Sequence, residues 1–252
     1  MLAIIGGTGL SQLEHFERVD VEAVPTAYAE APVAVLRLRH EHHEVLFLPR
    51  HGEGHVLPPH RINYRANIQA LKHLGATHVI AINAVGGIHV ELGPGHFAVP
   101  DQIIDYTSGR SVTFFEDDQS PVHHIDFTQP YDENLRQCML RACGEQVAIE
   151  GDDVRVLAGG VYGCTDGPRL ETAAEVKRLK RDGCDMVGMT GMPEAALARE
   201  QELAYASLAL SVNWAAGLGS EAITMEKIHQ VLDRGMHTVR SVLQRLANQD
   251  FN

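Results

Sequence analysis

The sequence predicts an α/β fold with a central β-sheet flanked by helices, built as one domain over residues 1–252. Two patterns carry this prediction: short β-branched or apolar runs recur along the chain, and segments with helical periodicity separate several of them. A hydrophobic content of 44% over 252 residues is sufficient for a substantial core and excludes a disordered or fibrous chain. Single α/β domains of roughly 200 to 250 residues are common, and no stretch resembles a linker.

The apolar runs are short and rich in β-branched residues, which is typical of buried strands. In chain order they span residues 2–5, 33–38, 45–48, 78–82, 97–104, 154–161, 185–187 and 205–212. Apolar residues at helical spacing predict helices over residues 62–74, 172–179, 193–203 and 225–246. Because strands and helices alternate, we expect ligands at the carboxyl ends of the strands. Residues 109–130 lack periodicity and are predicted to be a long excursion that caps a site or meets another subunit.

The charge balance limits the partners of the protein. There are 21 Lys and Arg against 33 Asp and Glu, a net charge of −12, which opposes non-specific binding to nucleic acid or anionic membranes. The four cysteines lack CxxC spacing, the N-terminus has no basic region, and no apolar run approaches the roughly 20 residues that span a bilayer. We therefore expect a cytoplasmic protein with reduced thiols.

A glycine-rich turn follows the first predicted strand. Its glycines allow backbone N–H groups to approach an anion closely, and the Thr8 hydroxyl adds a donor. A dinucleotide fingerprint requires a third glycine where this chain has Gln12, which disfavours a dehydrogenase. The alternative is a glycine turn without a ligand.

The sequence Arg50-His51-Gly52-Glu53-Gly54-His55 follows another strand. Arg50 and His51 form a plausible oxyanion clamp, since a guanidinium offers paired donors to phosphate. A metal site at His51 and His55 is an alternative, but no carboxylates complete a recognisable ligand set. A second histidine group is better explained as a solvated turn, and it consists of His40, His42 and His43.

Three later segments are weak signals when each is taken alone. Residues 82–87 end a strand in small residues that leave room for a flat ligand or simply terminate the strand. Residues 165–172 contain Glu171, which would also be explained as an acid in the first turn of a helix, favoured by the helix dipole. Residues 187–194 contain Met189, which would also be explained by packing in the core. Asn213 ends a strand where an amide could bind a heterocycle or form a turn.

Taken together in this order, the segments resemble the trimeric purine nucleoside phosphorylases, most closely their 5′-methylthioadenosine phosphorylase branch. The most specific stretches are IIGGTGL, RHGEGH with PPHRINYRANIQAL, GPGHFAVPDQIIDYT and GMTGMPEAALARE. The resemblance runs from Gly6 to the helix beginning at Met225. It implies a purine nucleoside phosphorylase-like domain with a mixed central sheet, a homotrimer, and reversible phosphorolysis with inorganic phosphate as co-substrate. It implies no metal and no organic cofactor.

The resemblance also assigns site residues. The phosphate-binding set is Thr8, Arg50, His51, Thr190 and the backbone near Ala84. Met189 would pack against the ribose, and the base would be flanked by Leu170, Val85 and Gly86. Asn213 would face N7 of the base, Glu171 would face N1, and His124 would reach the 5′ side from a neighbouring subunit.

Two departures from the methylthioadenosine branch bear on the substrate. The first concerns the residues that would bind the base. That branch has two aspartates where this chain has Asn213 and Ala215, and small hydroxyl residues where this chain has Glu171 and Thr172. An amide can donate to O6 and accept from a protonated N7, so these changes favour a 6-oxopurine. An amide can also flip, so adenine is disfavoured rather than excluded.

The second departure concerns the 5′ end of the sugar. Phosphorylases that accept a 5′-hydroxyl have a histidine near the start of the last helix, where this chain has Met225, followed by Ile228 and His229. A thioether suits a methylthio group. Together the departures imply 5′-methylthioinosine as substrate. The alternative substrates are 5′-methylthioadenosine and, if His229 faces the 5′ group, inosine or guanosine. An alternative of another class is a catalytically silent nucleoside-binding protein.

Overall fold

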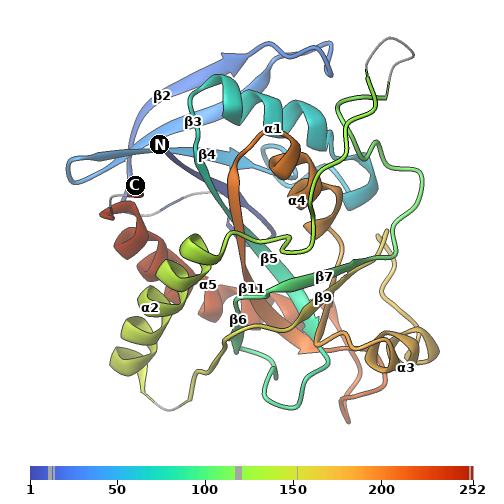
Figure 1. Ribbon diagram of the computed structural model, residues 1–252. Helices are drawn as coiled ribbons and strands as arrows, with labels where there is room; N and C mark the ends of the chain where they lie inside the picture. The colour runs from blue at the N-terminus through green and yellow to red at the C-terminus, as the bar shows by residue number, and fades with distance from the viewer. Residues whose placement is uncertain (11–12, 14, 117–120, 152, 250, 252) are drawn as a thin grey trace.

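The computed structural model describes the chain except residues 11–12, 14, 117–120, 152, 250 and 252, so Gln12 lies outside the described residues. In the described part, eleven strands form one mixed sheet with helices on both faces (Figure 1). The predicted fold class, an α/β fold with a mixed central sheet flanked by helices, is confirmed.

The first five strands build one half of the sheet. They are β1 (Leu2–Gly6), β2 (Glu17–Val24), β3 (Val33–His40), β4 (His43–Pro49) and β5 (His78–Gly87). β1 lies between β4 and β5 and is parallel to both, while β2, β3 and β4 form an antiparallel meander. The predicted histidine turn is the tight connection between β3 and β4, where His40 pairs with His43.

The other half of the sheet is built from shorter strands and one long strand. They are β6 (Phe97–Ala98), β7 (Gln102–Asp105), β8 (Val156–Leu157), β9 (Val161–Cys164), β10 (Met186–Gly188) and β11 (Ala204–Trp214). β11 runs parallel to the whole length of β5, whereas β10 is antiparallel to the end of β5. The prediction of single strands over residues 97–104 and 154–161 is wrong. Pro100, which lacks an N–H, separates β6 from β7, and a pair of positive-φ glycines, Gly159 and Gly160, separates β8 from β9.

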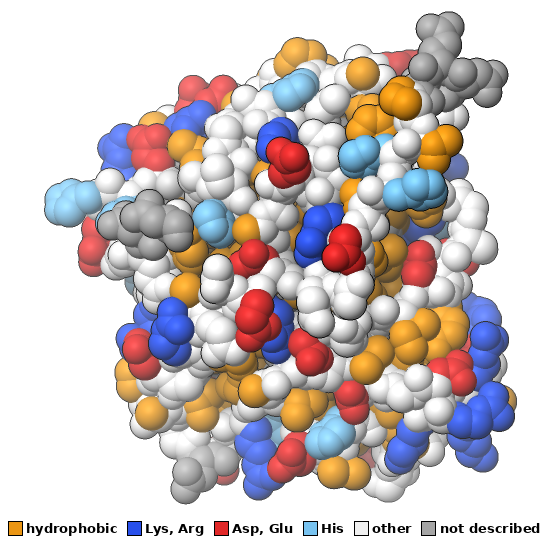
Figure 2. Space-filling model, viewed as in Figure 1, with side chains coloured by type: hydrophobic (Ala, Val, Ile, Leu, Met, Phe, Trp, Pro, Cys, Tyr) orange, Lys and Arg blue, Asp and Glu red, His pale blue; other side chains and the backbone are white. Residues whose placement is uncertain are grey.

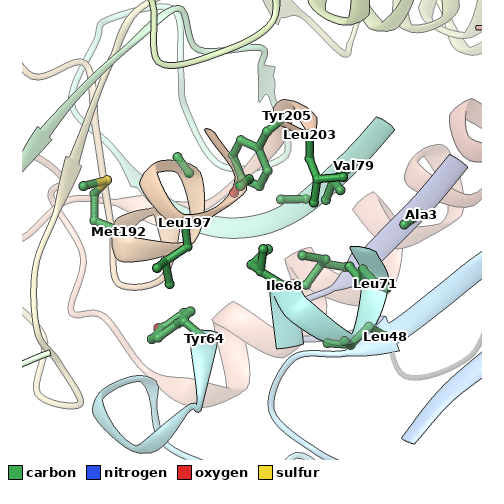
Figure 3. Packing of buried hydrophobic residues seen from close by; sticks show 14 of the residues in the cluster. Ala3, Leu48, Tyr64, Ile68, Leu71, Val79, Met192, Leu197, Leu203 and Tyr205 are labelled. Carbon is green, nitrogen blue, oxygen red and sulfur yellow. The ribbon is translucent and has the colours of Figure 1, made fainter. Parts of the chain in front are cut away.

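Helices cover both faces of the sheet because β1 and β5 are apolar on both sides. Ala3 and Ile5 pack in a core with α1 (Tyr64–His73) and α4 (Gly191–Glu200), part of which is seen in Figure 3. Leu2 and Ile4 pack in a second core with the two longest helices, α2 (Glu133–Glu150) and α5 (Met225–Ala247). The remaining helices are α3 (Ala173–Arg181) and the 3₁₀ helix Pro59–Arg61. The helix α2 and the strand β2 were not predicted.

The sheet opens at the middle of β5. β1 pairs with β5 only as far as Ala81, and β10 begins to pair at Gly86. Among the described residues, no strand therefore pairs with residues 82–85 on this edge of β5. β1 and β10 end beside this opening, so the loops that follow them converge there. This is a point at which strand order changes, and such points are where α/β sheets bind ligands.

Candidate active site

A cavity of about 280 Å³ lies at the opening beside β5. The structure brings most of the predicted site residues to its wall, although they are spread over more than 200 positions of the chain. They are Thr8, Arg50, His51, Ala84, Val85, Gly86, Leu170, Glu171, Met189, Thr190, Asn213, Met225 and Ile228.

Two predicted residues lie elsewhere. His229 lines a neighbouring cavity of about 380 Å³, which shares Thr8, Arg50 and His51 with the first cavity. Met225 and Ile228, which lie one turn apart on α5, face the first cavity instead. His124 is exposed on its own chain and lines neither cavity.

Arg50 is fully buried and paired with an acid that sequence reasoning did not select. Its Nε donates to Oε2 of Glu194 at 2.7 Å, and its Nη2 donates to Oε1 at 2.8 Å. Nη1 donates to the carbonyl of Ile82 at 2.9 Å, within the unpaired stretch of β5. Burial opposes the charge of Arg50, but the Glu194 carboxylate outweighs this and raises the pKa of the guanidinium. Arg50 thus reaches the cavity as one member of an ion pair.

His51 lies next to Arg50 and is neutral near pH 7. Burial, followed by the charge of Arg50, lowers the pKa of His51 to about 4. Its Nδ1 lies 2.8 Å from the carbonyl of Leu57, which fixes the hydrogen on Nδ1 because a carbonyl only accepts. Nε2 is therefore an acceptor, able to bind a protonated phosphate oxygen. The His55 ring lies over His51, with centroids 4.1 Å apart.

A chain of hydrogen bonds orients the hydroxyl of Thr190. Ser207 Oγ donates to Oδ1 of Asn83 at 2.6 Å, and Asn83 Nδ2 donates to Oγ1 of Thr190 at 2.8 Å. Because Thr190 Oγ1 already accepts this bond, its own hydrogen is available to a ligand in the cavity. The chain of bonds makes Thr190 a directed donor.

The cavity wall also carries an amide and an acid. Asn213 Nδ2 donates to the carbonyl of Trp214 at 2.7 Å, which leaves its second hydrogen and its oxygen for a ligand. Glu171 accepts a hydrogen bond from Thr165 Oγ1 at 2.7 Å. Together, the Asn213 amide and the Glu171 carboxylate can therefore donate hydrogen bonds to the edge of a heterocycle and accept hydrogen bonds from it.

The charge of the cavity is more balanced than a cationic clamp would be. Glu194 neutralises Arg50, and His51 is neutral, so the donors offered to an anion here are mainly hydroxyl and N–H groups. On the face seen in Figure 2, acidic and basic side chains are interspersed across the surface. This arrangement is suited to hold an anion by directed hydrogen bonds rather than by excess positive charge.

Comparison with known proteins decides the family. A sequence profile of the Phosphorylase superfamily matches residues 1–248. The chain belongs to the phosphorylase superfamily. A protein of Pseudomonas syringae pv. tomato named "Probable S-methyl-5'-thioinosine phosphorylase" is 54% identical to this phosphorylase over 245 residues, which is 97% of each chain. A protein of Thermococcus kodakarensis named "Probable 6-oxopurine nucleoside phosphorylase" is 40% identical over 249 residues, covering 97% of this chain and 90% of its own. The predicted resemblance to nucleoside phosphorylases is confirmed.

Solved structures agree with this family. The methylthioadenosine phosphorylase of Schistosoma mansoni in complex with adenine superposes on this phosphorylase with a TM-score of 0.90 and 32% identity, covering 98% of this chain and 90% of the other. The same protein in complex with tubercidin gives a TM-score of 0.86 and 31% identity, covering 98% and 89%.

Sequence reasoning about this phosphorylase missed two polar residues. Asn83 had a detectable signal, because it is the one polar side chain inside the apolar stretch of residues 79–85. Glu194 had none, since an acid in the first turn of a helix is common at surfaces.

The structure also bears on the metal alternative. Within the described residues of this phosphorylase, no group of three or more His, Cys, Asp or Glu side chains is arranged to hold a metal ion, and the rings of His51 and His55 contact one another at a tilt of 31°. No helix in the described ranges combines the length and apolarity needed to cross a bilayer.

Proposed function

We propose that this phosphorylase cleaves 5′-methylthioinosine with inorganic phosphate, giving hypoxanthine and 5-methylthioribose 1-phosphate. A phosphate oxygen attacks C1′ and forms the C1′–O bond while the C1′–N9 bond breaks. The bonding electrons leave with the purine, and the proton of the hydrogen phosphate that attacks C1′ passes through water to N7, so that neutral hypoxanthine and the sugar phosphate are released. The observation that carries the proposal is a single cavity whose wall holds hydroxyl and guanidinium donors together with an amide and an acid.

The phosphate end must hold an anion below C1′ without immobilising it. Thr8, Thr190, Arg50 and Ala84 line the same cavity. We assign phosphate to these groups, with the Nε2 atom of His51 accepting the hydrogen of a protonated phosphate oxygen. Directed donors that are already in place stabilise the developing charge without reorganising.

The base end must stabilise the negative charge of the departing purine. Asn213 offers an oxygen to a protonated N7 and a hydrogen to O6, and Glu171 accepts from N1–H, so we assign a 6-oxopurine to this end. Leu170, Val85 and Gly86 would flank the ring and Met189 the ribose. Met225 and Ile228 present apolar surface, which suits a methylthio group at the 5′ position.

We further propose a cytoplasmic homotrimer that requires no metal or organic cofactor. In this assembly His124, which is exposed on its own chain, would enter the cavity of a neighbouring subunit. The pocket rim at Met225, 59% exposed, would be covered in part by that neighbour.

The test is a panel of 5′-methylthioinosine, 5′-methylthioadenosine, inosine and adenosine, each with and without phosphate, with free base as the readout. We expect phosphate-dependent release and the highest kcat/KM for 5′-methylthioinosine. A preference for inosine would mean that the 5′ contact is polar, and a preference for 5′-methylthioadenosine would refute the assignment of Asn213. Nucleoside binding without turnover would indicate a silent binding protein.

A further inference from the structure

Arg110 is a buried arginine outside the residues assigned above. It lies shortly after β7, at the start of the segment that Figure 1 shows rising from the sheet and returning past α4 to α2. Only 4% of its side chain is exposed. A buried guanidinium is costly unless its donors are used, so the partners of Arg110 indicate what it does.

The guanidinium connects two loops of the cavity. Its Nη1 donates to the carbonyl of Met189 at 2.9 Å and also bonds the carbonyl of Met192, which lies at a non-helical position in the first turn of α4; the two carbonyls stand on either side of Thr190. Its Nη2 donates to the carbonyl of Asp166 at 3.0 Å and lies 3.3 Å from that of Thr165, in the loop that leads to Glu171. One planar group therefore joins the loop after β10 to the loop after β9.

Three further observations show how closely the segments around Arg110 are connected. Nη1 also lies 3.2 Å from the hydroxyl of Tyr64, the first residue of α1. The Asp166 carboxylate accepts from the backbone N–H and the hydroxyl of Ser108, which ties the segment that carries Arg110 to the loop after β9. A Cβ at Gly167 would meet Met189 Sδ at 2.4 Å, so the two loops are already in close contact.

We propose that Arg110 is a positioning residue of this phosphorylase, which holds the loop carrying Glu171 and the loop carrying Met189 and Thr190 in fixed register around the nucleoside. The proposal rests on the proposed function for its effect on catalysis, but not for its effect on the loops. Backbone carbonyls in loops lack the partners that a helix or strand would supply, and the five N–H donors of arginine fix several of them at once. A lysine has one donor centre and cannot span both loops.

The experiment compares Arg110→Ala and Arg110→Lys with Arg65→Ala. Arg65 is the matched control because it binds the same segment, through Glu116 and the Thr113 carbonyl, without a hydrogen bond to either loop. We expect Arg110→Ala to lower kcat/KM for the nucleoside about 10- to 100-fold, as a misplaced site would. The KM for phosphate should change less, since Thr8 and Arg50 have other supports. Added guanidinium ion should restore part of the activity of Arg110→Ala, and Arg110→Lys should be intermediate.

Amide hydrogen exchange of the ligand-free proteins separates this inference from the proposed function. Exchange in residues 165–171 and 189–192 should accelerate in Arg110→Ala, rise less in Arg110→Lys and stay unchanged in Arg65→Ala. Unchanged exchange in both Arg110 variants, or equal effects of Arg65→Ala, would overturn the positioning role. A wild type without phosphorolysis would refute the proposed function, while the exchange data would still decide on Arg110. If Arg110→Ala does not fold, Arg110→Lys carries the same comparison.

Discussion

At the scale of single residues, the pairing of Arg50 with Glu194 changes how the phosphate end is understood. The acid receives two donors from Arg50 and a third from Tyr205 at 2.9 Å, so both partners of the ion pair are well satisfied in a buried place. A buried pair of this kind contributes little net stability, but removing one partner leaves an uncompensated charge. Arg50 therefore has a structural effect that must be separated from its effect on phosphate.

A pair of variants makes that separation. Arg50→Met alone should lower the free energy of unfolding by about 3–5 kcal/mol, because the Glu194 carboxylate remains buried without its partner. Adding Glu194→Gln should recover most of that loss, since the amide is neutral and still accepts from Tyr205. Urea unfolding measures both. Neither protein should regain phosphorolysis, and a double variant with normal phosphate dependence would show that Arg50 serves the fold alone.

His51 makes the stability of the protein depend on pH. The unfolded state takes up a proton below the ordinary pKa of 6.5, while folded His51 does so only near pH 4. The contribution of neutral His51 to the free energy of unfolding is therefore complete above about pH 6.5. As the pH falls from there towards 4, the free energy of unfolding decreases by roughly 3 kcal/mol. His51→Gln, which keeps a donor for Leu57, should flatten this part of the pH profile in urea unfolding. His42→Gln, in the exposed turn, should leave the profile as it is.

Asn213 is the residue on which the choice of base depends. Asn213→Asp should shift preference from 6-oxopurine towards 6-aminopurine nucleosides, because a protonated carboxyl can donate to N7 and accept from the amino group. The shift should be partial, since Ala215 still lacks the second carboxylate and Glu171 still suits N1–H. Loss of the donor to O6 should lower kcat/KM for 5′-methylthioinosine roughly 10- to 100-fold. An unchanged ratio of kcat/KM for methylthioinosine and methylthioadenosine would mean that Asn213 does not contact position 6.

Among the helices and strands, the sequence predicted those whose own residues show a clear apolar run or stripe. β1, β5 and β11 are continuous apolar runs, and α5 has a clear apolar stripe, so they were found. β2 was missed because its residues are mostly exposed and its conformation depends on pairing with β3, which composition does not show. α2 was missed because polar residues occupy buried positions on it. Arg136 is one of them, and its donors bind the carbonyls of Pro100 and Val99.

The turn after β1 depends on a close approach between strands. A Cβ at Gly7 would lie 2.4 Å from the carbonyl of Ile82 and 3.1 Å from Nη1 of Arg50. Gly7→Ala should therefore displace Thr8 and Arg50, reduce phosphate-dependent kcat/KM and lower the free energy of unfolding by roughly 1–3 kcal/mol. Gly144→Ala is the control, since nothing lies near that position on α2 and alanine should stabilise the helix by about 0.5–1 kcal/mol. Equal behaviour of the two variants in unfolding and activity assays would contradict the steric argument.

At the scale of the whole molecule, the cavity gathers residues from the first turn to the last helix, and only the sheet explains why they meet. The motifs identified the residues of the cavity wall by resemblance. The supporting residues were not predictable in this way, because Glu194 and Arg110 act through partners distant in sequence: Glu194 pairs with a residue 144 positions away, and Arg110 reaches carbonyls up to 82 positions away. Contacts of that range are set by topology and leave no local pattern.

The proposed trimer is a property of the whole molecule, and mixed assemblies test it. His124→Ala keeps its own cavity but gives a neighbour no histidine, whereas Asn213→Ala has a defective cavity and an intact His124. Each variant alone should lose most of its kcat/KM. Co-expression with two affinity tags and sequential purification yields hybrids. In any mixed cyclic trimer, one His124→Ala subunit receives the histidine of an Asn213→Ala neighbour.

Hybrids should therefore recover about one third of the wild-type activity per trimer, since one of three sites is complete. This recovery requires His124 to act in the adjacent subunit, because a histidine acting on its own cavity would leave every site of a hybrid defective. His123→Ala is the control: its exposed ring contacts Phe115 on the same chain, and it should be active as a homotrimer. Sedimentation or light scattering of the purified hybrids gives the subunit number, and a fully active monomer would remove the proposed assembly together with the role of His124.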